Sequence, residues 1–135
     1  MRKQACALIA LSLLIIAVPV LAAGKSYSDA AFSAAQAAGK PILIHVKAPW
    51  CPTCKVQQPI LESLFKMQKF AAYERFDIDF DTGTRARKKF GVDVQSTLIV
   101  FKGKKEIARS SGVIDTTAIG ALLESGLTDT PPPHK

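Results

Sequence analysis

The pattern of apolar and polar positions predicts short strands that alternate with helices between residues 26 and 127. The run Ile42–Val46 is apolar except for His45, as in a buried strand, whereas Phe76, Ile78 and Phe80 alternate with other residues as in a strand with two different faces. The predicted strands are 42–46, 73–80, 97–101 and 106–110, the last two joined by a hairpin turn at 102–104.

Four other segments carry apolar residues at helical spacing. Ser28 and Asp29 can cap the first, which Gly39-Lys40-Pro41 stops, and Gly91 closes the third. The predicted helices are 29–38, one that begins at Cys51 and carries Val56, Ile60, Leu61, Leu64 and Phe65, 82–90, and 115–123 with Ala118, Ile119, Leu122 and Leu123 facing inward. This order predicts an α/β fold in which a central mixed sheet of four to five strands has helices on both faces.

The first 22 residues indicate export. Arg2 and Lys3 precede an uncharged apolar stretch at 5–20, and Val20-Leu21-Ala22 allows cleavage after Ala22. We therefore expect a signal peptide at 1–22, which would carry Cys6 away, and a periplasmic or secreted protein. The alternative is an uncleaved anchor in the inner membrane, because residues 5–23 are near the length that spans a bilayer.

The remaining chain is long enough for one domain, expected at 23–127, followed by a proline-rich tail at 128–135 that we expect to be disordered. Its formal charge falls from +7 to +5 when Arg2 and Lys3 are removed. The basic residues cluster at 85–89 and 102–105 without interleaved aromatic residues, so a solvated surface is favoured and no nucleic-acid partner is expected. We expect a monomer.

The sequence Trp50-Cys51-Pro52-Thr53-Cys54 indicates redox chemistry. It follows a buried strand and opens a helix, where unpaired backbone N–H groups favour a thiolate on Cys51. Pro52 suits the first helical position because its missing N–H would have no partner there. Cys54, about one turn further along, can resolve a mixed disulfide formed at Cys51.

Two other interpretations of this cysteine pair remain. The pair could form a static disulfide, or it could be half of a metal site. A zinc site needs about four ligands, and the chain after residue 22 offers only these two thiols with His45 and His134. The position of the pair between strand and helix favours the redox interpretation, which requires no metal and no organic cofactor.

The chain resembles the thioredoxin family over about residues 26–127. The resemblance rests on an ordered set of segments: 50–55 with Pro59 four residues later, 77–79, Phe90-Gly91-Val92, and 97–103. It implies a thioredoxin-like fold, with Cys51 as the exposed nucleophile, Cys54 as the resolving thiol and Trp50 as a wall of the site. It also implies that substrate proteins are recognised around Trp50, Pro52, Gln95 and Ser96.

Two positions depart from the family pattern. The family usually has a cis-proline where this chain has Ser96, so Ser96 is either trans with a shifted loop or cis under strain, and its hydroxyl could donate to a Cys51 thiolate. The family commonly has a buried acid where this chain has His45. We expect His45 to accept the Cys54 proton, the alternative being a neutral, hydrogen-bonded core histidine.

The predicted function is that of an exported thiol–disulfide oxidoreductase acting on protein thiols and disulfides. We favour a reductase that a membrane reductant-relay protein keeps reduced, because no helical domain is inserted between Phe76 and Thr97. The alternatives are a general thiol oxidant and a non-catalytic module that binds a partner, a metal or an Fe–S cluster through Cys51 and Cys54.

Overall fold

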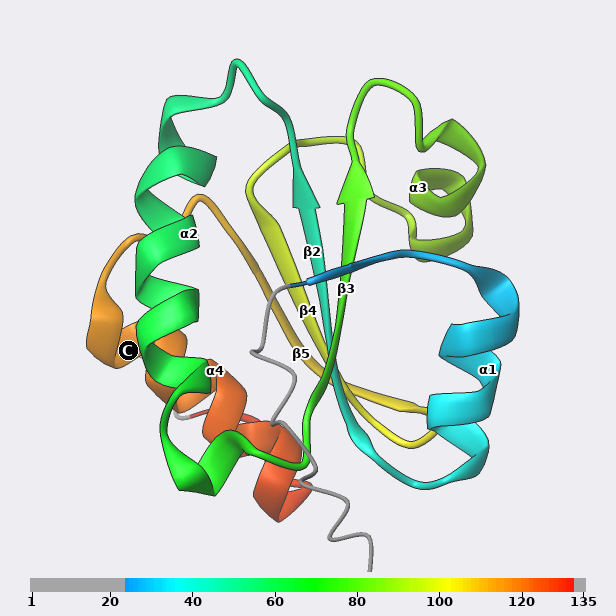
Figure 1. Cartoon of the computed structure of the whole chain (residues 1–135), viewed down its shortest axis with the longest axis vertical. Coiled ribbons are helices and arrows are strands. Elements are labelled where there is room, and N and C mark those ends of the chain that lie inside the picture. The colour runs from blue at the N-terminus through cyan, green and yellow to red at the C-terminus, as the bar shows by residue number, and fades with distance from the viewer. Residues whose placement is uncertain (1–23, 133–135) are drawn as a thin grey trace, which may run out of the picture.

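A five-stranded sheet forms the centre of residues 24–132, the part of the chain that the computed structural model describes (Figure 1). The strands lie in the order β1-β3-β2-β4-β5. They are β1 (Lys25–Ser26), β2 (Pro41–Lys47), β3 (Glu74–Asp79), β4 (Thr97–Lys102) and β5 (Lys105–Ser111). Because β1, β3 and β2 pair in parallel and β4 and β5 pair antiparallel, the sheet is mixed, as the sequence predicted.

Four α-helices and one short 3₁₀ helix cover the sheet, with α1 and α3 on one face and α2 and α4 on the other (Figure 1). They are α1 (Asp29–Ala37), α2 (Pro52–Phe65), η1 (Gln68–Phe70), α3 (Thr84–Phe90) and α4 (Thr116–Thr128). The predicted caps are present: the Ser28 side chain accepts the Ala31 N–H, and Gly91 ends α3 with a φ of 61°. Such a positive φ suits glycine because it has no Cβ.

Alternation along β2 divides the buried apolar residues into two cores. Ile42, Ile44 and Val46 pack on the α1–α3 side, whereas Leu43 packs on the α2–α4 side. His45 follows the second alternation and therefore lies beneath α2, fully buried. The central strand thus brings one titratable side chain under the helix that begins at the cysteine pair.

The structure corrects several predicted details. Helix α4 continues five residues beyond the predicted end at Leu123, because the small buried residues Ser125 and Gly126 allow its last turns to approach the sheet. A Cβ on Gly126 would collide with the side chains of Tyr73 and Val100. Ser125 and Gly126 break the apolar pattern, so periodicity could not predict this contact.

Two apolar residues that the sequence placed on helical stripes are exposed. Ala118 faces solvent on α4, and Val56 is 44% exposed on α2, where the adjacent Gln57 is buried in its place. Apolar periodicity could not predict that Gln57 is buried and Val56 exposed, because it assigns the buried face of a helix by hydrophobicity alone. Strand β1 and helix η1 were also missed, since two or three residues are too few for a periodic pattern.

Candidate active site at the Cys51–Cys54 disulfide

Cys51 and Cys54 form a disulfide at the start of α2, with their Cα atoms 5.3 Å apart. Cys51 is the N-cap of this helix and Pro52 occupies the first turn, as predicted. The Cys54 backbone N–H donates a hydrogen bond to Cys51 Sγ at 3.1 Å. In the reduced protein this donor and the positive end of the helix dipole stabilise a thiolate on Cys51.

Both cysteines are buried in the disulfide form, with exposed fractions of 1% for Cys51 and 4% for Cys54. They pack together with Ala48 and the partly buried Phe80. The resemblance implied an exposed Cys51, and this part of the expectation is wrong for the oxidised state. What distinguishes Cys51 from Cys54 is therefore its place at the helix terminus and not its exposure.

Trp50 lies directly before the disulfide and is 54% exposed. Its indole Nε1–H donates to Asp81 Oδ2 at 2.8 Å, and its ring meets Phe80 edge-on. Pro52, on the other side of Cys51, is also exposed. These contacts hold a large aromatic surface beside Cys51, where the resemblance implies a wall of the site.

Ser96 is trans and adopts a φ of 56°, so the loop before β4 takes the strained left-handed conformation instead of a cis bond. Its hydroxyl donates to the Gln95 carbonyl at 2.6 Å. The hydroxyl is therefore engaged within the loop and does not donate to a sulfur in this state. The Ser96 carbonyl accepts the Gly112 N–H, which ties this loop to the end of β5.

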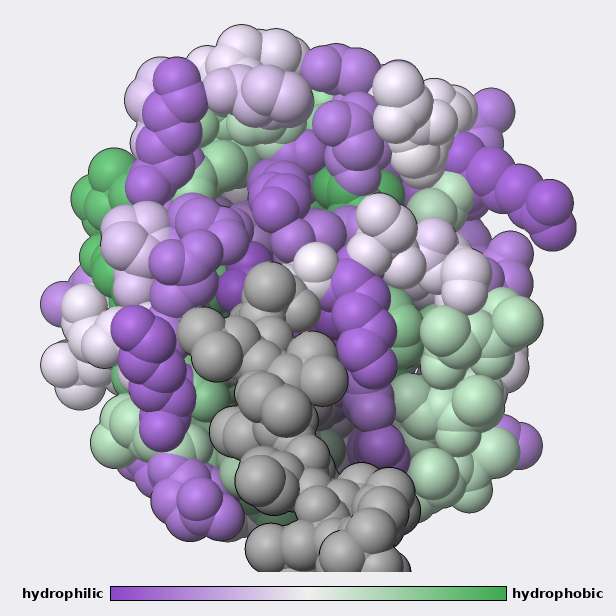
Figure 2. Space-filling view, viewed as in Figure 1, coloured by the Kyte–Doolittle hydropathy of each residue, from purple (hydrophilic) through white to green (hydrophobic). Residues whose placement is uncertain are grey.

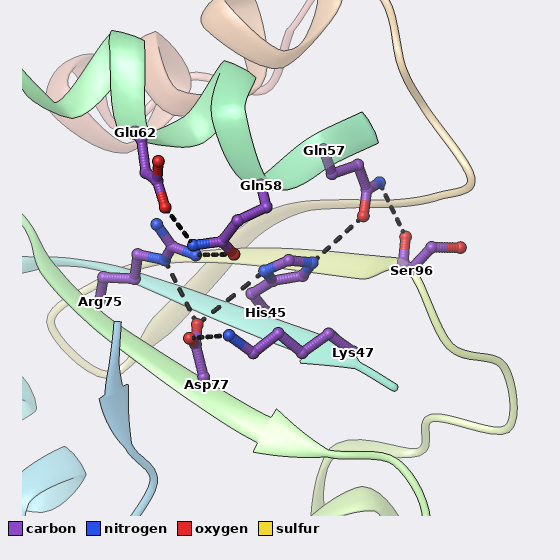
Figure 3. A network of polar contacts seen from close by, with 8 residues as sticks. All are labelled: His45, Lys47, Gln57, Gln58, Glu62, Arg75, Asp77 and Ser96. Carbon is purple, nitrogen blue, oxygen red and sulfur yellow. Dashed lines mark hydrogen bonds and ion pairs between the residues drawn. The ribbon is translucent and has the colours of Figure 1, made fainter. Parts of the chain in front are cut away.

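His45 belongs to a buried network that the sequence did not predict (Figure 3). Gln57, on α2, is fully buried, and its Oε1 lies 3.2 Å from His45 Nε2. The Gln57 amide nitrogen donates to two carbonyl oxygens, Ser96 O at 3.1 Å and Val113 O at 2.8 Å. One glutamine thus links α2 to β2, to the loop before β4 and to the loop after β5. The sequence feature that could have identified Gln57 is a polar residue on the apolar stripe of α2.

The other ring nitrogen of His45 faces the sheet neighbour. Nδ1 makes no hydrogen bond among the described residues and lies 3.9 Å from Asp77 Oδ1. Burial lowers the pKa of His45 to about 4, despite the opposing effect of the Asp77 carboxylate. The imidazole is therefore neutral near pH 7.

Asp77 joins His45 to a group of charged residues (Figure 3). Its carboxylate accepts from Lys47 Nζ at 2.6 Å and from Arg75 Nε at 3.3 Å, and Arg75 also donates to Gln58 Oε1 at 2.9 Å. A pocket of about 620 Å³ opens beside this group. Its lining residues are Gly24, Ser26, Lys47, Ala48, Pro49, Cys54, Lys55, Gln58, Pro59, Asp77 and Asp79.

Within residues 24–132 no three side chains of His, Cys, Asp or Glu gather in a way that could hold a metal ion. His134 lies outside these residues, as does the predicted signal peptide at 1–22. None of the described helices is both long enough and apolar enough to span a membrane.

Comparison with known proteins agrees with this geometry. The family model for thioredoxin matches residues 24–125. The chain belongs to the thioredoxin family. A thioredoxin from Chlamydia muridarum is 35% identical over 82 residues, which are 61% of this chain and 78% of the relative.

Solved thioredoxin structures show the same fold. The structure of Trxlp from Edwardsiella tarda EIB202 is 42% identical, with a TM-score of 0.71 over 73% of this chain and 95% of the other. Thioredoxin O2 from Arabidopsis thaliana, in its oxidised state, is 28% identical with a TM-score of 0.63, over 71% and 83% of the two chains. The predicted thioredoxin-like fold is confirmed.

Membership of the thioredoxin family, together with the Cys51–Cys54 disulfide, makes this protein a thiol–disulfide oxidoreductase. Thioredoxins act on protein disulfides, so proteins are the substrate class. The fold brings the two cysteines and Trp50 together, and it places His45 beneath α2, linked through Gln57 to Ser96. The roles assigned to His45, Trp50, Pro52, Gln95 and Ser96 stay predictions.

Proposed function

We propose that this protein is an exported reductase of protein disulfides. The observation that carries the chemistry is the Cys54 N–H bonded to Cys51 Sγ at the start of α2, because it stabilises the attacking thiolate. Cys51 attacks a substrate disulfide and forms a mixed disulfide, releasing one substrate thiolate. Cys54 then attacks Cys51 Sγ and releases the second, so the substrate gains two electrons and the protein becomes the disulfide.

The reducing direction is supported by the connection between β3 and β4. In the described segment 80–96, α3 is the sole helix, so no helical domain of the kind carried by oxidases is inserted there. A membrane reductant-relay protein would return Cys51 and Cys54 to the dithiol. Substrate proteins would contact the exposed Trp50 and Pro52 and the Gln95–Ser96 loop.

Export rests on the sequence of residues 1–22 alone. A protein secreted from cells that express the full chain is expected to begin at Ala23, as N-terminal sequencing would show. Recovery of the full-length chain in the membrane fraction would instead support the uncleaved anchor. Periplasmic or extracellular location matters for function because the cytosol already keeps disulfides reduced.

His45 is proposed to take part in proton transfer from Cys54 during resolution. Its support is its position beneath α2 and its neutral state near pH 7, in which a ring nitrogen can accept a proton. The low pKa of about 4 makes it a weak acceptor by itself. A neighbouring anion would therefore have to assist it.

The reduction potential of the Cys51–Cys54 pair tests the proposal. Protein that begins at Ala23 is equilibrated in glutathione and dithiothreitol buffers, with Cys51→Ser as the control that cannot form the disulfide. A potential near about −270 mV supports a reductase, whereas one near about −120 mV means a general oxidant. If the pair forms no reversible disulfide and the cysteines instead bind a metal or a coloured cluster, the protein is the non-catalytic binding module and not an oxidoreductase.

A further inference from the structure

The network beside α2 contains a carboxylate that the predicted chemistry does not use. Asp77 lies on β3 directly opposite His45 on β2 in the parallel register. Its side chain is 11% exposed, and it lines the same pocket as Cys54. We propose that Asp77 accepts the proton that leaves Cys54 during mixed-disulfide resolution and shares it with His45. This inference rests on the proposed thiol–disulfide cycle and names the proton acceptor within it.

Gln57 determines which nitrogen of His45 can take part. Because the Gln57 amide nitrogen donates to the Ser96 and Val113 carbonyls, its oxygen is the atom that faces His45 Nε2. Nε2 must then carry a hydrogen and donate it to that oxygen. Neutral His45 can accept a proton only at Nδ1, the nitrogen that faces Asp77. His45 therefore receives a proton next to Asp77 and not on its Gln57 side.

The pocket connects Asp77 to the resolving cysteine. Cys54 contributes to it from α2, and Asp77 and Lys47 contribute from β3 and β2. It is large enough to hold several water molecules, and polar side chains of its lining, among them Lys47, Gln58 and Asp77, can bind them. Such water can carry a proton between groups that do not touch. Hydrophilic side chains gather along the middle of the face that presents β1, β3 and α2 (Figure 2).

Asp77 lies between two cations and His45. Lys47 Nζ lies 2.6 Å from its Oδ2 and Arg75 Nε lies 3.3 Å from its Oδ1, while His45 Nδ1 lies 3.9 Å from the same Oδ1. The pair therefore offers two acceptor atoms 3.9 Å apart for one proton. The charged and titratable groups around it are His45 and Lys47 on β2, Arg75 and Asp79 on β3, and Cys54 and Lys55 on α2.

The chemical step is balanced. The Cys54 thiol loses its proton through pocket water to the Asp77 carboxylate, and the Cys54 sulfur attacks Cys51 Sγ. The Cys51–Cys54 bond forms as the bond from Cys51 to the substrate sulfur breaks. The substrate leaves as a thiolate that takes a proton from solvent, and Asp77 returns its proton to solvent through the pocket.

The test separates the two exchange steps in time. Reduced protein is mixed with an aromatic disulfide that releases a coloured thiolate when Cys51 attacks and a second one when Cys54 resolves. For Asp77→Asn we expect the second phase to slow about tenfold or more at pH 7. The difference should vanish at a pH where Cys54 is ionised without help, since no proton then needs an acceptor.

A further variant distinguishes this role from a structural one. Asp79→Asn removes the same charge from the same pocket, but Asp79 bonds to the Thr82 backbone, so its second phase should stay within twofold of the original protein. A structural role for Asp77 would instead slow the second phase of Asp77→Asn by the same factor at every pH, including a pH where Cys54 is ionised without help.

Two results would overturn the proposal while leaving the oxidoreductase intact. One is an unchanged second phase in Asp77→Asn between pH 6 and 8, and the other is a loss by the same factor at every pH. If the original protein itself releases thiolate in one phase and forms no reversible disulfide, the proposed oxidoreductase function is wrong. That result differs from the two above, in which the original protein forms the disulfide and only the role of Asp77 is contradicted.

Discussion

The strongest structural prediction concerns Gln57, whose side chain joins three segments of the fold. Gln57→Leu keeps the volume of the side chain but removes its hydrogen bonds to His45 Nε2, Ser96 O and Val113 O. His45 is fully buried, so its Nε2–H would be left without a partner, whereas the Ser96 carbonyl keeps its hydrogen bond from the Gly112 N–H. Val113 is partly exposed, and water can replace its bond.

A buried polar group that loses its partner costs about 1–3 kcal/mol. One such group, partly offset by the apolar side chain, gives an expected loss of about 1.5 kcal/mol in the free energy of unfolding, against a typical total of about 5–15 kcal/mol. With a urea dependence of about 1.5 kcal/mol per molar, the midpoint should fall by about 1 M.

Urea unfolding followed by the fluorescence of Trp50 measures this change. Gln36→Leu is the matched control, because Gln36 lies partly buried on α1 and makes no side-chain hydrogen bond within the described residues. Its midpoint should move by no more than about 0.3 M, corresponding to about 0.5 kcal/mol. A Gln57→Leu midpoint within about 0.5 M of the original, at an unchanged slope, would refute the view that Gln57 satisfies groups that otherwise stay unpaired.

Three other variants test the site. Ser96→Gly should raise the free energy of unfolding by up to about 1 kcal/mol, because the φ of 56° suits glycine. Ser96→Pro should lower it by more than about 1 kcal/mol, because proline cannot adopt this φ. Thermal midpoints of the two variants that move in the same direction would contradict this. His45 has a folded pKa of about 4 against an ordinary 6.5, so the unfolded chain binds a proton first as pH falls. Stability should therefore decline between about pH 6.5 and 4, by about 3 kcal/mol in total, and urea titrations should show a shallower decline in His45→Gln. Cys54→Ser should accumulate a mixed disulfide with a substrate protein and Cys51→Ser should not, which mass spectrometry would detect; equal trapping by both would contradict the assignment of Cys51 as the nucleophile.

Much of the fold was predictable because its elements are determined locally. The caps at Ser28, Gly91 and Cys51 and the apolar run of β2 predicted the main elements nearly in register. The failures occurred where a tertiary contact overrides the local pattern. The last turns of α4 carry small and polar residues and form only because a close approach to the sheet favours them.

The sequence by itself determined where the cysteine pair lies. Two thiols with two residues between them, placed after a buried strand and at the start of a helix, predict a thiolate on Cys51, because the helix terminus is a local property. The sequence also identified His45 and Ser96 as departures from the family. It could not say what either residue contacts.

Only the tertiary structure decided how these departures are accommodated. Gln57, twelve residues from His45 and thirty-nine from Ser96, binds both, and its amide orientation determines which nitrogen of His45 is free. Parallel pairing of β2 with β3 then places Asp77 beside that nitrogen. Hydrogen bonds between segments far apart in the chain depend on the packing of the whole fold, and no local pattern encodes them.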